Sequence, residues 1–510
     1  MPIKKSMKSI VILYESKSEY AEQKVFDGKS ALEKTLDWAA LFAEEDNIVK
    51  IGDCSSTAEV LEKIVLSAQE KNADYIIFSF DDLPFINEEI TKKLIEQHIK
   101  YHAEYTFSDG YPAGFAPEII NAQAAAIMAK LSRTNLKDAG EKKVSRSVIY
   151  DFIKNDINSF DVETFIAPHD WRLLRFSFNT ACKRDFLSCK ALFNSIQDKN
   201  DLCNADKLAE AASKNVAVLK TLPAYYNIQI CNSTNTNAIY NPALTVKNAV
   251  NDEKMSYEDF ASLTKRISEF SEDAVISLSV YGEPFVHSQI MQIIENVLSY
   301  PEFSLFLETD GLNITEEICS KLKELLASCP KAKKNPYPKL MIAVQMDAFT
   351  KEGYAKIHKN GDFEKVTNAI SLLSSYLPGS VYPQFIRMNE NEEELEAFFR
   401  YWNEKTSPAG GNFIIQKYDN FAGLLPERKP ADLSPLERNV CWHLRRDMTI
   451  LANGDVCLCR SCLFENPLGN VFKEDLESIW HKSDCIVSNH VENKLNEKCG
   501  KCDEFYTFNF

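Results

Sequence analysis

Seven of the 14 cysteines of this 510-residue chain lie in one stretch near its C-terminal end, and this stretch limits what that part can fold into. It begins at Cys441 and ends with the pair Cys499-x-x-Cys502, while the other seven cysteines are scattered before residue 330. A disulfide scaffold would spread its cysteines through a small domain. Dense clustering at one end of a large protein is instead typical of metal binding. A single cysteine would be interpreted as a core residue, but this set predicts a metal site.

The spacing indicates how four of these cysteines can meet. Residues Thr449–Leu458 have apolar side chains around Asn453-Gly454, a dipeptide typical of a type I′ hairpin turn. Such a hairpin can bring Cys441 near Cys459, and the CxxC pair supplies two more thiolates. Four thiolates form a tetrahedral sulfur site, which suits zinc or an iron–sulfur cluster and does not discriminate between them.

The same stretch resembles a known domain. Cys441, Gly454 and Cys459 are separated by twelve and four residues, and Leu468–Val471 and Leu476–Trp480 follow. This pattern, over about residues 436–502, resembles SPASM, the auxiliary-cluster domain at the end of many radical-SAM enzymes that modify peptides and proteins.

The resemblance implies a ligand set. A 4Fe–4S cluster is expected on four cysteines, and three others are additional candidate ligands. The longer SPASM form has two more cysteines after its CxxC; none follows Cys502 in this sequence, so one cluster is expected. The expected ligands are Cys441, Cys459, Cys499 and Cys502, and the additional candidates are Cys457, Cys462 and Cys485.

The rest of the chain is predicted to have an α/β fold, because strand-length apolar runs alternate with helical ones. Three domains are expected: an N-terminal α/β domain (1–220), a central full or partial (β/α) barrel (221–430) and the cysteine-rich end (436–510). The predicted strands are Ser9–Leu13, Asp74–Phe80, Asn227–Ile230, Val275–Val280, Ser304–Leu307, Lys339–Gln345 and Val381–Met388. The predicted helices are Ser30–Glu44, Ser56–Lys71, Glu88–Tyr101, Tyr257–Phe270, Ser288–Ser299, Thr315–Ser328 and Phe363–Ser375.

The central part resembles a radical-SAM barrel. The candidates for binding S-adenosylmethionine (SAM) are Gly282, Glu283 and Pro284, which follow a predicted strand, as Thr309–Gly311 follow the next. The motif CxxxCxxC, which holds the catalytic cluster in that family, is missing. Its three positions are occupied by Thr234, Ala238 and Asn241. Alanine cannot bind iron, and threonine and asparagine offer hard oxygen donors. Radical-SAM catalysis is therefore not expected.

The N-terminal part resembles GT-A nucleotidyltransferases, with Asp82 at the position that helps hold Mg²⁺ and Asp170–Asn179 at a later strand. That family has a glycine-rich, phosphate-binding loop, but the loop at Tyr14–Glu22 has no glycine and three acids. Asp82 is therefore expected to be a turn residue, without a magnesium nucleotide. The order GT-A-like domain, cysteine-less radical-SAM-like barrel and SPASM end resembles the spiro-SPASM protein family.

Charge and hydropathy narrow the class of function. A net charge of −16 and a pI near 5.2 disfavour nucleic acid and anionic membranes as partners. No segment has the ~20 consecutive apolar residues of a membrane span, and a cytoplasmic protein is expected. The first hypothesis is an iron–sulfur protein with a binding or redox role, with an electron-transfer partner and a peptide or protein substrate. The alternatives are an enzyme that uses SAM or a nucleotide, and a zinc-stabilised scaffold.

Overall fold

The computed structural model describes residues 7–134, 144–330 and 337–507. They belong to two compact units, Met1–Thr221 and Leu222–Phe510. Each unit has its own sheet and its own apolar core, so the predicted α/β class is confirmed. Within the described ranges, no helix combines the length and the apolar composition that crossing a membrane would require.

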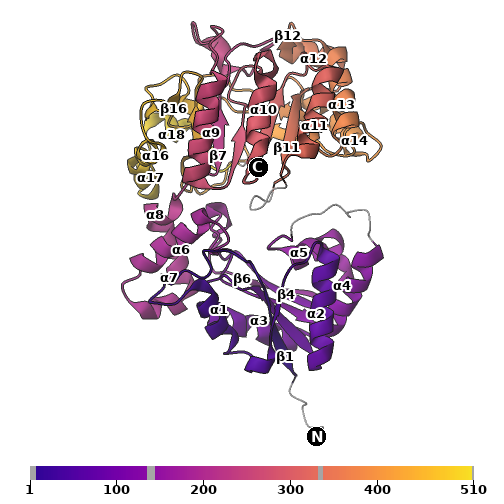
Figure 1. Ribbon diagram of the computed structural model, residues 1–510, viewed down its shortest axis with the longest axis vertical. Coiled ribbons are helices and arrows are strands. Elements are labelled where there is room, and N and C mark those ends of the chain that lie inside the picture. The colour runs from indigo at the N-terminus through magenta and orange to yellow at the C-terminus, as the bar shows by residue number, and fades with distance from the viewer. Residues whose placement is uncertain (1–6, 135–143, 331–336, 508–510) are drawn as a thin grey trace. The chain divides into compact units, whose positions relative to one another are not determined.

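The first unit contains a six-stranded mixed sheet in the order β2-β1-β3-β5-β4-β6 (Figure 1). Strand β5 is antiparallel to both of its neighbours, and the other pairings are parallel. The strands are β1 (Ser9–Tyr14), β2 (Ile48–Ile51), β3 (Tyr75–Phe80), β4 (Tyr105–Asp109), β5 (Glu118–Asn121) and β6 (Val162–Ile166). The helices are α1 (Ala31–Ala39), α2 (Thr57–Lys71), α3 (Glu88–Tyr101), α4 (Ala122–Thr134), α5 (Val148–Ile153), α6 (Lys183–Ser195), α7 (Ala205–Lys214) and α8 (Val216–Leu219).

Both faces of this sheet are buried. Helices α2, α4 and α5 cover one face, packing on alternate residues such as Ile10, Ile12 and Ile76. The intervening Val11 and Ile77 are also fully buried. Near-continuous apolar strands such as β3 are typical of a sheet covered on both sides.

The second unit is built on a nine-stranded sheet in the order β14-β13-β11-β10-β9-β7-β15-β16-β17. From β14 to β15 every pairing is parallel, and β16 and β17 continue antiparallel. The strands are β7 (Tyr225–Ile228), β9 (Ala274–Ser277), β10 (Phe303–Thr309), β11 (Leu340–Gln345), β13 (Val381–Arg387), β14 (Ile414–Lys417), β15 (Asp447–Ile450), β16 (Asp455–Cys457) and β17 (Gly469–Asn470). A separate two-stranded sheet joins β8 (Asn237–Ala238) to β12 (His358–Lys359).

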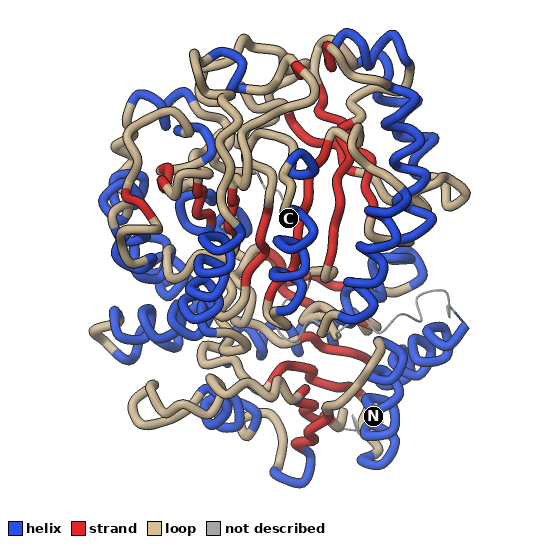
Figure 2. Tube along the Cα trace, turned by 45° about the horizontal axis from the view of Figure 1, so that its top comes forward, coloured by secondary structure: helices blue, strands red, loops and turns tan. Residues whose placement is uncertain are grey.

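Amphipathic helices follow the parallel strands and cover the outer side of this partial barrel (Figure 2). They bury apolar side chains such as Phe260, Ile293 and Leu373 in one core. The helices are α9 (Tyr257–Ser271), α10 (Ile290–Ser299), α11 (Glu316–Ser328), α12 (Lys351–Ile357), α13 (Phe363–Tyr376) and α14 (Leu395–Asn403). The short helices of the C-terminal part are α15 (Trp442–Arg446), η9 (Arg460–Cys462), α16 (Leu476–His481), α17 (Asp484–Val491) and α18 (Glu497–Lys501).

The cysteine-rich part is joined to the barrel through the hairpin β15–β16. Strand β15 pairs in parallel with β7, placing Thr449 opposite Asn227. The hairpin itself is as expected, but the predicted type I′ turn is wrong, since of the turn residues only Gly454 has a positive φ, 85°. The N–H of Gly454 donates to the carbonyl oxygen of Leu451, 2.9 Å away. This is the three-residue loop in which a glycine follows an ordinary turn.

Candidate metal centre

The fold brings the predicted cysteine ligands together from separate segments. Cys441 directly precedes α15, which leads into β15, and Cys459 lies between β16 and η9. Cys499 lies in α18 and Cys502 directly follows it. The β15–β16 pairing joins the first two segments. The backbone N–H of Trp442 donates to the Phe505 carbonyl oxygen at 2.9 Å, which joins the first segment to the last.

The thiols are buried or half-buried and influence one another. Burial raises the pKa of Cys441 to about 12, and nearby Cys502 and Cys499 add to the effect. The pKa of Cys459 is raised well above its usual range, first by a hydrogen bond with the Cys462 thiol and then by burial. Burial also raises the pKa of Cys499, and it raises that of Cys502 to about 12. Each of the four predicted ligands thus influences or is influenced by another cysteine of this part, and with Cys462 they form one group of neighbouring thiols.

This group offers sulfur donors only. Metals bind the thiolate, so a metal would displace the protons that burial favours. Cysteine thiolates are the ligands of iron–sulfur clusters, and the donor set therefore fits such a cluster. Among the described residues, no three or more Cys, His, Asp and Glu side chains have the spacing to hold a single metal ion.

The three additional cysteines have different surroundings. Cys462 contacts the group directly, and its hydrogen bond with Cys459 lowers its pKa. Cys457 is 3% exposed and packs in an apolar cluster with Val280 and Phe421. Cys485 is exposed in α17, with its Sγ 3.8 Å from the Lys482 carbonyl oxygen. The structure therefore brings Cys462 to the predicted ligands and leaves Cys485 on the surface.

The residues at the missing radical-SAM ligand positions have structural roles. Ala238 lies in β8, opposite His358 of β12. The side-chain oxygen of Asn241 accepts a hydrogen bond from the backbone N–H of Ala243 at 3.0 Å. With Thr234 they line a cavity of about 60 Å³, far below the ~300–1,000 Å³ of ligand pockets.

Gly282 and Glu283 connect the ends of neighbouring strands. Gly282 has a φ of 96°, and a Cβ there would lie 2.3 Å from the Cys231 carbonyl oxygen. Glu283 is 3% exposed, and burial raises its pKa well above the usual range. Its carboxylate accepts hydrogen bonds from Thr309 Oγ1 and the Asp310 N–H, both at 2.8 Å. These contacts give the motif a structural role at the ends of β9 and β10.

A second buried carboxylate has a similar role. Asp347 accepts hydrogen bonds from the Tyr240 hydroxyl (2.8 Å) and from the N–H of Ile386 (2.6 Å). His358 Nε2 lies 2.8 Å from the same carboxylate, and its ring stacks on Tyr354 with centroids 4.5 Å apart. The group holds β8, β12 and β13 together, which gives Asp347 a structural role.

In the first unit, Asp82 is fully buried and both of its oxygens accept hydrogen bonds from Arg146, one of them at 2.9 Å. The Arg146 guanidinium also lies over the Phe80 ring, 4.8 Å from its centroid. A cation at Asp82 would have to displace this guanidinium. Asp82, in the loop after β3, is thus the buried anionic half of an ion pair with the partly exposed Arg146.

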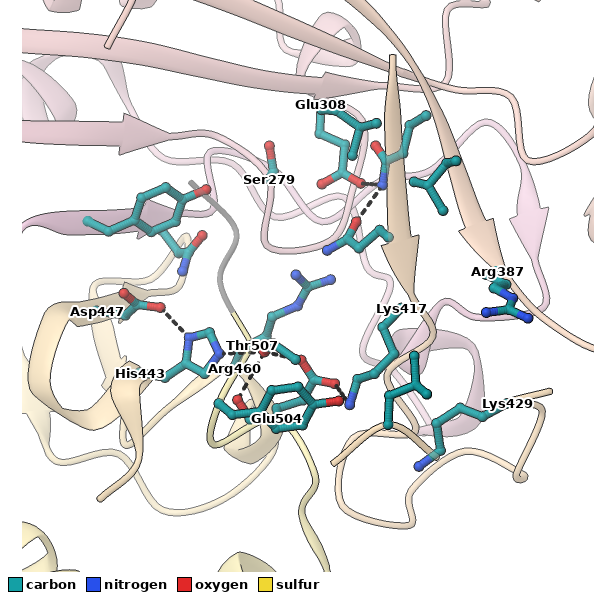
Figure 3. A pocket seen from close by; sticks show the side chains of 18 of the residues that line it. Ser279, Glu308, Arg387, Lys417, Lys429, His443, Asp447, Arg460, Glu504 and Thr507 are labelled. Carbon is teal, nitrogen blue, oxygen red and sulfur yellow. Dashed lines mark hydrogen bonds and ion pairs between the residues drawn. The ribbon is translucent and has the colours of Figure 1, made fainter. Parts of the chain in front are cut away.

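A larger cavity, which the sequence did not indicate, lies inside the second unit (Figure 3). Its volume is about 530 Å³, and its walls include the inner sides of β7, β10, β13 and β14 together with C-terminal residues. A chain of hydrogen bonds crosses one wall, from Asp447 through His443 and Thr507 to Glu504, and ends in an ion pair between Glu504 and Lys417. Neither Arg460, directly after Cys459, nor Glu308 in β10 belongs to a motif that could have singled it out.

Comparison with known proteins identifies the C-terminal part. Residues 441–503 match the family model of SPASM, an iron–sulfur cluster-binding domain. The chain is 38% identical over 371 residues to an uncharacterized protein of Treponema pallidum (strain Nichols), which covers 71% of this chain and 99% of that protein.

Two further similarities are more distant. The chain is 25% identical over 161 residues to the spore coat polysaccharide biosynthesis protein SpsF of Bacillus subtilis (strain 168), covering 31% of this chain and 63% of that one. Among solved structures, SuiB of Streptococcus suis aligns with a TM-score of 0.42 and 13% identity, covering 62% of this chain and 79% of that one.

Proposed function

The chain belongs to the same family as the Treponema pallidum protein, and because it ends in a SPASM domain we propose that it binds one 4Fe–4S cluster through Cys441, Cys459, Cys499 and Cys502. The observation that carries the proposal is the gathering of these thiols from three segments inside the matched domain. When bound, the cluster would supply one-electron redox chemistry. The proposed role is electron transfer or binding, with a redox partner and a peptide or protein as substrate.

Residues around the thiols would hold the ligands in place. The Arg438 guanidinium donates to the Cys499 carbonyl oxygen and lies over the Phe505 ring, 4.4 Å from its centroid. The backbone N–H of Cys499 donates to the Asn496 side chain at 2.7 Å, which caps α18. These contacts hold the backbone of the CxxC pair in place. A preorganised ligand set of this kind favours metal binding.

We propose that the barrel binds no catalytic cluster of its own. Thr234, Ala238 and Asn241 offer no thiolate where such a cluster would be held, and the cavity beside them is small. Glu283 and Gly282 are engaged in strand-end contacts. These observations disfavour the alternative of a SAM-using enzyme, and the Arg146–Asp82 pair disfavours a nucleotide-using one.

A visible absorption experiment tests the proposal. Full-length protein purified without oxygen is expected to be brown, to bleach with dithionite and to recover with a mild oxidant. Replacing Cys499 and Cys502 together by alanine should abolish the colour, whereas Cys485→Ala should retain it, because Cys485 is exposed and lies outside the thiol group. A colourless wild-type protein that contains zinc would contradict the proposal and favour the scaffold alternative.

A further inference from the structure

The 530 Å³ cavity of the second unit has the dimensions of a small-molecule site, within the ~300–1,000 Å³ of ligand pockets. Part of its wall is apolar, formed by Phe306, Ile414, Ile415 and Leu433. The rest is polar, and its charged side chains determine which molecule it can take.

Most charged groups of the wall already have a partner of opposite charge. Lys417 lies 2.6 Å from Glu504, and Asp447 lies 2.6 Å from His443 and 2.5 Å from Arg446. Arg387 pairs with Glu392, and Lys429 pairs with Asp503. In each pair the opposite charges compensate each other, so the pairs add little net charge to the wall that a ligand would contact.

Two charged groups of the wall have no such partner. Arg460 makes no hydrogen bond or ion pair among the described residues, and its Nε is buried without a partner. Its guanidinium lies over the Phe421 ring, 5.6 Å from the centroid, and is attracted by the carboxylates of Asp419, Glu308 and Glu504 without contacting them. Glu308 accepts hydrogen bonds only from the neutral amides of Gln345 (3.1 Å) and Gln384 (3.0 Å). Figure 3 shows the Arg460 side chain projecting into the cavity, with Glu308 on the strand side. Both side chains are half-buried, so their charges are only partly solvated, and a ligand that carries both opposite charges would be stabilised between them.

Arg460 and Glu308 lie where two cavities meet, because both also line the 60 Å³ cavity. Ser279 is the third residue common to the two linings, and its hydroxyl is buried without a hydrogen-bond partner. The Oε1 atom of Gln384, next to Glu308, is also without a partner. Unpaired polar atoms of several kinds thus converge on one place.

We propose that this cavity binds a small zwitterion of the α-amino-acid class, with its carboxylate on Arg460, its ammonium group on Glu308 and its side chain against the apolar wall. A planar guanidinium binds a carboxylate through two hydrogen bonds. A ligand with only a negative charge would leave Glu308 unpaired and be repelled by it. A ligand with only a positive charge would leave Arg460 unpaired and be repelled by its guanidinium. This proposal does not depend on the cluster.

Calorimetric titration of the anaerobically purified full chain tests it. The probes are leucine, phenylalanine and tyrosine, with two analogues of phenylalanine that each lack one charge: phenylalaninamide and 3-phenylpropanoate. At least one amino acid should bind saturably, and its single-charge analogues should bind about tenfold more weakly or worse, as expected for loss of a charged hydrogen bond.

The variants Arg460→Gln and Glu308→Gln should each weaken amino-acid binding by about tenfold or more. Glu308→Gln should not weaken binding of 3-phenylpropanoate, which has no ammonium group. The matched controls are Arg400→Gln and Glu396→Gln, an exposed pair on α14 that should leave binding unchanged. Ile415→Trp, at a 40% exposed position of the wall, should reduce binding by narrowing the cavity.

Because Arg460 follows Cys459, iron is measured in every variant, so that loss of the cluster is separated from loss of the ligand. Absence of binding for all three amino acids would overturn the proposal. Equal binding by wild type, Arg460→Gln and Glu308→Gln would overturn it as well.

Discussion

Cys459 and Cys462 share a hydrogen bond at the candidate metal centre, although only Cys459 occupies a SPASM ligand position. If Cys459 is the ligand, Cys459→Ala should lower the iron content at least severalfold, while Cys462→Ala should retain it. Iron analysis of the two anaerobically purified variants makes the comparison, and each is the other's matched control. Iron lost from Cys462→Ala and retained in Cys459→Ala would reverse the assignment.

His98 of α3 predicts a pH dependence of stability in the first unit. It is 1% exposed, and burial lowers its pKa from 6.5 to about 4. The unfolded chain therefore takes up this proton first as the pH falls, so stability is full above pH 6.5 and is lost progressively down to about pH 4. By linkage, this group should cost about 2 kcal/mol between pH 7 and pH 5.

Urea denaturation of the full chain at pH 7 and pH 5 measures this effect. His98→Asn should remove that part of the pH dependence, whereas His102→Asn, at an exposed left-handed position that asparagine tolerates, should keep it. An equal loss of stability on acidification in wild type and His98→Asn would show that His98 is not the group responsible.

Some features of the candidate sites could be predicted from individual residues of the sequence, and others could not. Cysteine spacing was enough to predict the SPASM domain, which the family model confirms over residues 441–503, while the four ligands within it stay a prediction. Nothing local marks Glu308 or Arg460, which are 152 residues apart and meet only through the fold of the barrel. The partner of Asp82 is also remote in sequence, since Arg146 lies 64 residues away.

At the scale of elements, the loop after β9 is held by a close backbone contact. Gly282→Ala would introduce both a positive-φ penalty and a clash with the Cys231 carbonyl oxygen. The expected loss of unfolding free energy is at least about 2 kcal/mol. Gly379→Ala is the control, because Gly379 has a φ of 83° with nothing within 4 Å of a Cβ. Equal losses in thermal denaturation of the two variants would contradict the role of the clash.

The positions of helices and strands with a periodic apolar pattern were predicted better than the pairing of strands in the sheets. The predicted helix Glu88–Tyr101 has the bounds of α3, and the predicted strand at 381–388 is β13 within one residue. The four-residue strand β14 was missed, since it is short and follows a Pro/Gly-rich stretch. The parallel pairing of β15 with β7 joins residues more than two hundred positions apart, and no local pattern encodes it.

For the whole molecule, the proposal places one cluster in the SPASM domain and neither SAM- nor nucleotide-dependent catalysis in the rest of the chain. Isothermal titration with nucleoside triphosphates plus Mg²⁺ should give no binding heat. SAM should give none either, because its cationic sulfonium and its nucleoside do not suit the apolar wall that is proposed to hold an amino-acid side chain. Two further reasons are the small cavity beside Thr234, Ala238 and Asn241 and the Arg146 guanidinium on Asp82. Saturable binding of SAM would instead favour the alternative of an enzyme that retains this cofactor.

The iron and acid-labile sulfide content of the anaerobically purified full chain tests the central claim most directly. If one cluster is bound by the C-terminal cysteines and none by the barrel, the protein should contain about four irons and four sulfides per chain. Both should be lost when Cys499 and Cys502 are replaced by alanine. About eight irons would contradict a single cluster, and zinc without iron would contradict an iron–sulfur protein altogether.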